Sequence, residues 1–129
     1  MKSDPKECLY CQNNETLHNL MIEVAQLSVS RVFLFKEQTY RGRCLVAYKD
    51  HVNDLNELSD EDRNAFMADV ARVTRAMQKA FQPEKINYGA YSDKLSHLHF
   101  HLAPKYVDGP DYGGVFQMNP GTVSYTHLT

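Results

Sequence analysis

His97-Leu98-His99-Phe100-His101-Leu102-Ala103 is the stretch that most constrains the fold, because histidine and apolar residues alternate along it. Successive side chains of a β-strand point to opposite faces of the sheet. We therefore predict a strand over 97–103 whose apolar side chains enter a core: Leu98, Phe100 and Leu102. The three imidazoles then form a row on the other face, and a rigid strand suits a functional site better than a loop does.

Three interpretations of this row of histidines compete. Ordinary hydrogen-bonded surface histidines rarely alternate so strictly. One metal ion bound by all three is strained, because the Cα atoms of His97 and His101 would lie about 13 Å apart while Zn–N bonds are only about 2 Å long. A pair such as His97 and His99 could share an ion, but the third histidine would then have no role.

Phosphoryl or nucleotidyl transfer is the third interpretation, and it requires a row of rings rather than a convergent cluster. A neutral imidazole is nucleophilic at physiological pH and can form a covalent phosphoramidate. Flanking imidazoles can orient it and donate hydrogen bonds to phosphate oxygens as charge develops. We favour this interpretation.

The rest of the chain predicts short strands around one long helix. The expected strands are 32–35, 44–48, 86–91 and 97–103. The first two are joined by a polar turn at 38–43, and a short helix is expected earlier, at 16–27. The long helix begins after Ser59, whose side chain can cap it, and ends before Pro83. Hairpins on both sides of a helix indicate an α+β domain, an antiparallel sheet with the helix packed on one face.

Length and composition limit the function classes. The 129 residues are 43% hydrophobic and 23% charged with a net charge of −2, which does not favour a nucleic-acid-binding surface. No apolar run approaches the roughly 20 residues of a membrane span. The first residues lack the apolar core of a signal peptide, so we expect a cytosolic location. We also expect one domain over 1–120 and a tail at 121–129 that contributes nothing to the core.

The three cysteines fit a reducing compartment. Cys8 and Cys11 are spaced C-x-x-C, which is typical there of metal binding or redox chemistry rather than of a disulfide framework. A redox pair needs a strand-to-helix turn that the surrounding residues do not suggest. A structural zinc ion would need about two further ligands. Cys44 lies alone in an apolar run and is expected to be buried as a small hydrophobic side chain.

The 97–103 stretch, with Pro104-Lys105-Tyr106 after it, resembles the signature of the histidine-triad (HIT) family, in which three histidines alternate with apolar residues. The upstream stretches that share the resemblance are 45–51, 58–59 and 86–90. The family implies an antiparallel sheet of about five strands, a homodimer, and hydrolysis or transfer at the α-phosphate of a purine nucleotide. By position, His99 would be the nucleophile that forms a nucleotidyl-histidine, and His101 would contact the phosphate and assist the leaving group.

The same resemblance implies further site residues. Several HIT proteins, and the related galactose-1-phosphate uridylyltransferases, hold zinc at positions that correspond here to Cys8, Cys11, His51 and His97. The loop before the triad would donate to phosphate through Ser92, Lys94 and Ser96. Glu37 is our candidate for a contact with the ribose hydroxyls.

The sequence leaves the substrate open. Dinucleoside polyphosphates, nucleoside phosphoramidates and aminoacyl-adenylates are all cleaved at the same phosphorus. A zinc-stabilised nucleotide-binding module with little catalysis is the alternative from a different class, and it would not need a nucleophile at position 99. Residues 121–129 depart from the family pattern, and we expect this tail not to be part of the native HIT-like domain.

Overall fold

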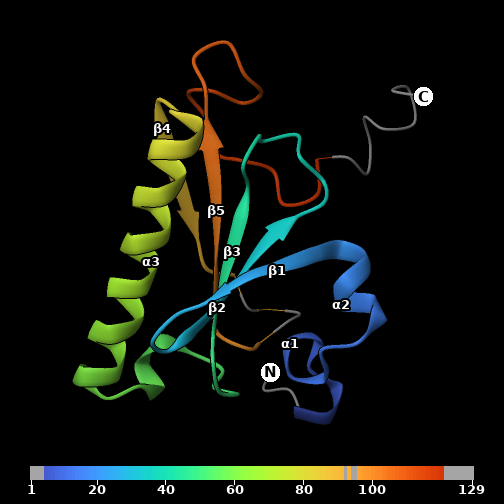
Figure 1. Ribbon diagram of the computed structural model, residues 1–129, viewed down its shortest axis with the longest axis vertical. Helices are drawn as coiled ribbons and strands as arrows, with labels where there is room; N and C mark the ends of the chain where they lie inside the picture. Colours follow the sequence, from blue (N-terminus) through green and yellow to red (C-terminus); the bar gives the residue numbers. More distant parts are fainter. Residues whose placement is uncertain (1–4, 92, 94–95, 121–129) are drawn as a thin grey trace.

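The computed structural model describes residues 5–91, 93 and 96–120 (Figure 1). Its strands are β1 (Met21–Gln26), β2 (Ser30–Phe35), β3 (Cys44–Tyr48), β4 (Lys85–Gly89) and β5 (His99–Lys105). Its helices are η1 (Pro5–Glu7), α1 (Leu9–Gln12), α2 (Glu15–Leu20), η2 (Leu55–Glu57) and α3 (Asp60–Phe81). The strands form one antiparallel sheet in the order β1-β2-β3-β5-β4, and the long helix α3 covers one face. The predicted α+β class and five-stranded sheet are confirmed.

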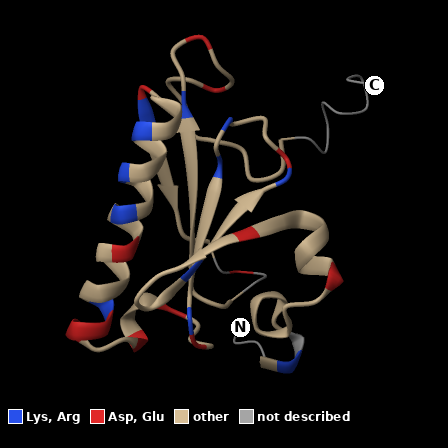
Figure 2. Ribbon diagram, viewed as in Figure 1, with Lys and Arg blue, Asp and Glu red and all other residues tan. Residues whose placement is uncertain are grey.

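Helix α3 begins and ends where its sequence predicts. The Ser59 side chain caps the first turn by accepting a hydrogen bond from the Asp62 backbone N–H, and three acidic residues occupy that turn. The helix ends at Phe81, and its C-cap Gln82 adopts the left-handed conformation with φ 53° directly before Pro83. Figure 2 shows acidic residues at the N-terminal end of α3 and basic residues further along it, the arrangement that the helix dipole favours.

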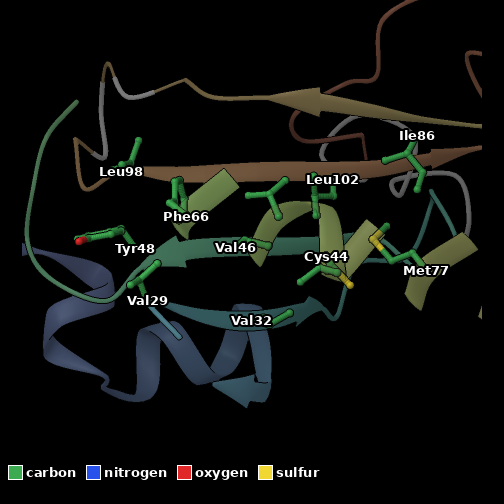
Figure 3. Packing of buried hydrophobic residues seen from close by; sticks show 12 residues of the cluster. Val29, Val32, Cys44, Val46, Tyr48, Phe66, Met77, Ile86, Leu98 and Leu102 are labelled. Carbon is green, nitrogen blue, oxygen red and sulfur yellow. The ribbon is translucent and has the colours of Figure 1, made fainter. Parts of the chain in front are cut away.

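The main core lies between α3 and the sheet (Figure 3). Its buried members are Val29, Val32, Cys44, Val46, Tyr48, Phe66, Val70, Val73, Met77, Ile86, Leu98 and Leu102. Cys44 is 7% exposed in this core, so its predicted role as a small hydrophobic side chain is confirmed. A buried Asp69 on α3 accepts hydrogen bonds from the Val29 backbone N–H and the Ser30 hydroxyl, which ties the β1–β2 hairpin to the helix.

The predicted helix over 16–27 is wrong in its second half. The chain is helical over α2 and then becomes the edge strand β1, which pairs with β2 along its length. The β-branched Ile22 and Val24 favour a strand, and pairing with β2 supplies backbone hydrogen bonds that a helix would otherwise provide. The histidine strand is also shifted, because β5 begins at His99 rather than at His97.

No helix in the described ranges combines the length and apolarity needed to cross a bilayer. The tail at 121–129 lies outside the described residues. The domain boundary at residue 120, the homodimer and the cytosolic location stay predictions.

Candidate active site

The three histidines form a row on the face of the sheet opposite α3, as the alternation predicts. Their apolar neighbours Leu98 and Leu102 are buried in the α3 core. In the register between β3 and β5, His99 lies opposite Ala47 and His101 opposite Leu45. β5 has a neighbouring strand on each side, so the row is held by hydrogen bonds from both β3 and β4.

The imidazoles are buried rather than exposed on this face. His97, His99 and His101 are only 2%, 2% and 6% exposed. The ring of Tyr10 in α1 packs against His97 and His99, with ring centroids 5.4 and 5.3 Å away. Phe35 packs edge-on against His101 at 5.6 Å. The predicted zinc ligands already bring the segment around the two cysteines to His97, but we did not predict from the sequence that Tyr10 and Phe35 cover the row.

Backbone carbonyls determine which nitrogen carries the proton in two of the rings. His97 Nε2 lies 2.7 Å from the Tyr48 carbonyl oxygen, and His99 Nδ1 lies 2.6 Å from the His97 carbonyl oxygen. A carbonyl oxygen only accepts, so each of these nitrogens donates. The lone pair of neutral His97 is therefore on Nδ1, and that of neutral His99 is on Nε2. The two rings present opposite nitrogens, one suited to a metal ion and the other to an electrophile.

Burial keeps all three histidines neutral at physiological pH. It is the main reason that the pKa of His97 falls to about 4, with His51 and His99 adding to the effect. Burial likewise lowers the pKa of His99, against the hydrogen bond to the His97 carbonyl. The pKa of His101 falls to about 3 through burial and through the neighbouring His99 and Arg43. A neutral ring keeps the lone pair that nucleophilic attack requires.

His101 contacts Arg43, a residue that sequence reasoning missed. Arg43 precedes β3 and is fully buried. Its Nη2 lies 3.1 Å from His101 Nδ1, and its guanidinium carbon lies over the rings of Phe35 and Phe116, 4.4 and 5.3 Å from their centroids. The signal that could have found it is an arginine placed directly before a strand of five apolar residues.

The segment after β5 folds back over the same end of the row. The Lys105 ammonium donates to the Asp111 and Gly114 carbonyls, both at 2.6 Å. The buried Tyr40 hydroxyl donates to the Asp111 carboxylate at 2.5 Å and accepts from the Gln117 backbone N–H at 2.6 Å. These bonds hold the segment that carries Phe116, whose ring centroid lies 6.3 Å from that of His101.

Two cysteines and two histidines form a cluster at the other end of the row. Cys8 Sγ lies 3.2 Å from His97 Nδ1, and Cys11 Sγ lies 3.5 Å from the same atom and 3.4 Å from His51 Nδ1. One ligand atom from each of the four side chains lies within 4.8 Å of the others. Adjacent sulfur and nitrogen ligands of a tetrahedral zinc ion lie about 3.5 Å apart, so the spacing fits a metal ion. The four predicted ligands are thus brought together from three separate parts of the chain, with both cysteines supplied by α1 and its N-cap.

Only two of the four predicted nucleotide-binding residues, Ser96 and Glu37, lie within the described residues. Ser96 is buried beside His97 in the chain. Glu37 lies on an exposed loop after β2, where its carboxylate accepts hydrogen bonds from the Thr39 backbone N–H at 3.1 Å and the Thr39 hydroxyl at 2.5 Å. Ser92 and Lys94 lie outside the described residues.

Comparisons with known proteins agree with this geometry. The model of the HIT domain family matches residues 13–108. The chain is 32% identical over 89 residues to the adenosine 5'-monophosphoramidase of Schizosaccharomyces pombe, over 65% of the chain and 64% of that protein. It is 28% identical over 90 residues to the Bacillus subtilis protein named hit, over 66% of the chain and 62% of that protein. The matched regions thus span less than two thirds of either relative's length.

Solved structures show the same fold. A histidine-triad protein of Sinorhizobium meliloti superposes with a TM-score of 0.73 at 21% identity, covering 81% of this chain and 78% of that one. A HIT family member from Bacillus subtilis gives 0.69 at 24% identity, covering 87% and 82%. With a matching family model over most of its length, and three alternating histidines in and just before the interior strand β5, the chain belongs to the HIT family.

Proposed function

We propose that the protein cleaves purine nucleotide substrates at the α-phosphate, as a hydrolase or nucleotidyl transferase, through a nucleotidyl intermediate on His99. The observation that carries the proposal is the 2.6 Å contact of His99 Nδ1 with the His97 carbonyl, which leaves the lone pair on Nε2. A neutral imidazole in this tautomer is an effective nucleophile. Membership of the HIT family and the relative named as an adenosine 5'-monophosphoramidase support the same activity.

The reaction has two steps. His99 Nε2 donates its lone pair to the α-phosphorus while the bond from phosphorus to the leaving group breaks. The leaving group departs with the bonding electron pair, and an amine leaving group also takes a proton from solvent. Water then attacks the nucleotidyl-histidine, which releases the nucleoside monophosphate and a proton and regenerates neutral His99. His101 donates a hydrogen bond to the phosphate or to the leaving atom as negative charge develops there.

Nucleoside phosphoramidates are the substrate class that we propose first, because the named activity of the fission yeast relative is cleavage of a phosphoramidate. Dinucleoside polyphosphates are the second class, since the same attack on the α-phosphorus would cleave them. Ser92, Lys94 and Ser96 are our proposed phosphate contacts, and Glu37 is our proposed contact with the ribose hydroxyls.

Zinc is the ion that we propose for the cluster of Cys8, Cys11, His51 and His97. Two thiolates and two imidazoles are a common donor set for structural zinc, and the ligand spacing suits a tetrahedral ion. Its role would be structural, because it would join α1 to the start of the histidine strand. The Cys8 side chain already caps α1 by accepting from the Cys11 backbone N–H at 3.4 Å.

The proposed intermediate can be tested by intact-mass measurement. The protein is mixed with adenosine 5'-phosphoramidate, denatured within the first turnovers at neutral pH, and weighed. We expect a species heavier by one adenylyl group in the wild type and none in His99→Gly. His18→Ala is the matched control, because His18 is an exposed histidine on α2 whose ring contacts the Asn13 side chain, away from the histidine row.

Each result has a defined meaning. An adduct that persists in His99→Gly, or turnover that is retained there, would overturn the assignment of the nucleophile. Nucleotide binding without turnover or adduct in the wild type would instead favour the zinc-stabilised binding module.

A further inference from the structure

Arg43 is a buried cation in contact with His101, next to the proposed reaction centre. Its Nη2 lies 3.1 Å from His101 Nδ1, and its Nη1 donates to the carbonyls of Gln117 and Met118 at 3.4 and 3.0 Å. Its Nε has no hydrogen-bond partner within the described residues. Burying a guanidinium is costly unless its donors are satisfied. A fully buried arginine with an unpaired donor therefore calls for a reason beyond packing.

The charge of Arg43 is not neutralised by an ion pair. In the described part of the chain, no carboxylate oxygen lies within 4.0 Å of its guanidinium nitrogens. Burial lowers the pKa of Arg43 to about 10, which still leaves it charged at neutral pH. The aromatic rings of Phe35 and Phe116, over which the guanidinium lies, stabilise the cation without cancelling the charge. A positive charge therefore remains next to the Nδ1 atom of His101.

The contact between Arg43 and His101 has one hydrogen-bonding direction. A guanidinium only donates, so His101 Nδ1 must accept, and the proton of the neutral ring is on Nε2. In serine proteases a carboxylate stands behind the histidine and stabilises it as a base. Here a cation, Arg43, contacts Nδ1 of the histidine instead. The ring is therefore a poor base and a good hydrogen-bond donor through Nε2–H.

We infer that Arg43 is a positioning residue for the proposed reaction, holding His101 as a neutral Nε2–H donor toward the phosphoryl oxygens or the leaving atom. This inference rests on the proposed function for its chemical consequence, but the tautomer of His101 can be measured without any substrate. His99 and His101 are then opposite tautomers on one strand, one set by a carbonyl and the other by a guanidinium. The first ring presents a lone pair at Nε2 and the second a proton.

The first test is the tautomer of His101, read from the ¹⁵N chemical shifts of its ring at neutral pH. We expect the wild type to show a protonated Nε2 and an unprotonated Nδ1. In Arg43→Met we expect His101 to give a mixture of tautomers or altered shifts while the shifts of His99 stay unchanged. Arg41→Met is the matched control: Arg41 lies two positions earlier, is exposed and stacks on Phe81 at 5.6 Å, so its loss should leave His101 unaltered.

The second test is kinetic. Misplacing the proton of the serine-protease histidine lowers kcat by about 10⁴. His101 can still adopt the Nε2–H tautomer without Arg43, so we expect a smaller fall in kcat of Arg43→Met, about tenfold to a hundredfold, with KM changed less than kcat. Arg43→Lys keeps a buried cation that can donate to Nδ1, and we expect it to recover part of kcat and the wild-type tautomer.

The outcomes separate the two proposals. A wild-type His101 protonated on Nδ1, or a folded Arg43→Met variant with the wild-type tautomer and kcat, would overturn the role of Arg43. If Arg43→Met does not fold, the wild-type and Arg43→Lys spectra still decide the tautomer. An absence of turnover and of the adenylyl adduct in the wild type would defeat the proposed function while leaving the tautomer result standing.

Discussion

The two faces of the sheet differ in how many polar side chains they bury. The face under α3 is closed by apolar side chains such as Phe66 and Val46, both 0% exposed. The histidine face has an apolar cluster of its own, which includes Phe33 and Leu45. It also buries Arg43 and the three imidazoles, all at 6% exposure or less, beneath two short helices and the segment after β5. On the first face, stability depends on the apolar area removed from water. On the second, each polar group needs a particular partner atom to offset its desolvation.

This difference predicts that substitutions on the two faces affect different properties. A truncation under α3 should lower stability and leave the chemistry of the folded protein intact. A change in the histidine row should alter the chemistry more than the stability. The exception is a residue that binds the proposed metal ion, since its loss should also lower stability.

The largest expected effect is the loss of activity in His99→Gly. Removing a nucleophile deletes a bond that forms only during reaction, so kcat should fall by about 10⁴-fold or more. Nucleotide binding should stay within about tenfold of the wild type. Steady-state kinetics with an adenosine phosphoramidate measure kcat, and equilibrium binding of AMP measures the affinity. An unchanged kcat would contradict the assignment of the chemistry to the histidine face.

Phe66→Ala is the corresponding change on the α3 face. Phe66 is fully buried and packs against Tyr48 and Phe100, with ring centroids 5.5 and 5.9 Å away. Its truncation should lower the free energy of unfolding by about 3–5 kcal/mol. Urea unfolding measures this loss, and kcat per folded molecule should be unchanged. Arg75→Ala, on the exposed side of the same helix, should cost less than about 0.5 kcal/mol.

Loss of the metal ion should lower stability by an intermediate amount. An ion that binds only the folded state contributes about 2.7 kcal/mol when its concentration is a hundred times its Kd. We expect Cys8→Ser to lose the ion, measured by elemental analysis, and to lower Tm. Cys44→Ala is the matched control on the α3 face and should keep the ion. Metal-free wild-type protein with the Tm of the metal-bound protein would contradict the proposed site.

The smallest expected effect is a loss of stability in mild acid. The pKa of His101 is about 3 in the folded chain and about 6.5 when unfolded, so the unfolded chain binds one more proton between these values. Stability should therefore be unaffected above pH 6.5 and fall below it, by at most about 1.4 kcal/mol per pH unit for this histidine. Urea unfolding at pH 7 and 5.5 tests this.

The matched variant for the acid experiment is His101→Gln, whose side-chain carbonyl can still accept from Arg43. It should show a shallower loss of stability than the wild type over the same pH range. An equal slope in the two proteins would show that His101 does not supply the acid sensitivity of the histidine face.

Local patterns were enough to predict several elements. The alternation in 97–103 predicted which side chains of β5 face the α3 core, because the period of a strand is a property of its backbone. Ser59 and Pro83 predicted the ends of α3, because capping and the proline ring act on the adjacent backbone. The 16–27 stretch was mispredicted because the partner that makes its second half a strand, β2, is a neighbour in space.

The sequence by itself therefore determined the sidedness of the histidine strand, the extent of α3 and the kinds of residue that carry the chemistry. Only the tertiary structure decided which atom faces which. It brings Cys8 to His97 across 89 positions and Arg43 to His101 across 58. The tautomer of His99 is set locally, by the carbonyl two residues before it. The lone pair of His97 and the proton of His101 are set by partners distant in sequence, the Tyr48 carbonyl and Arg43, because a hydrogen bond depends on the positions of two groups that the fold brings together.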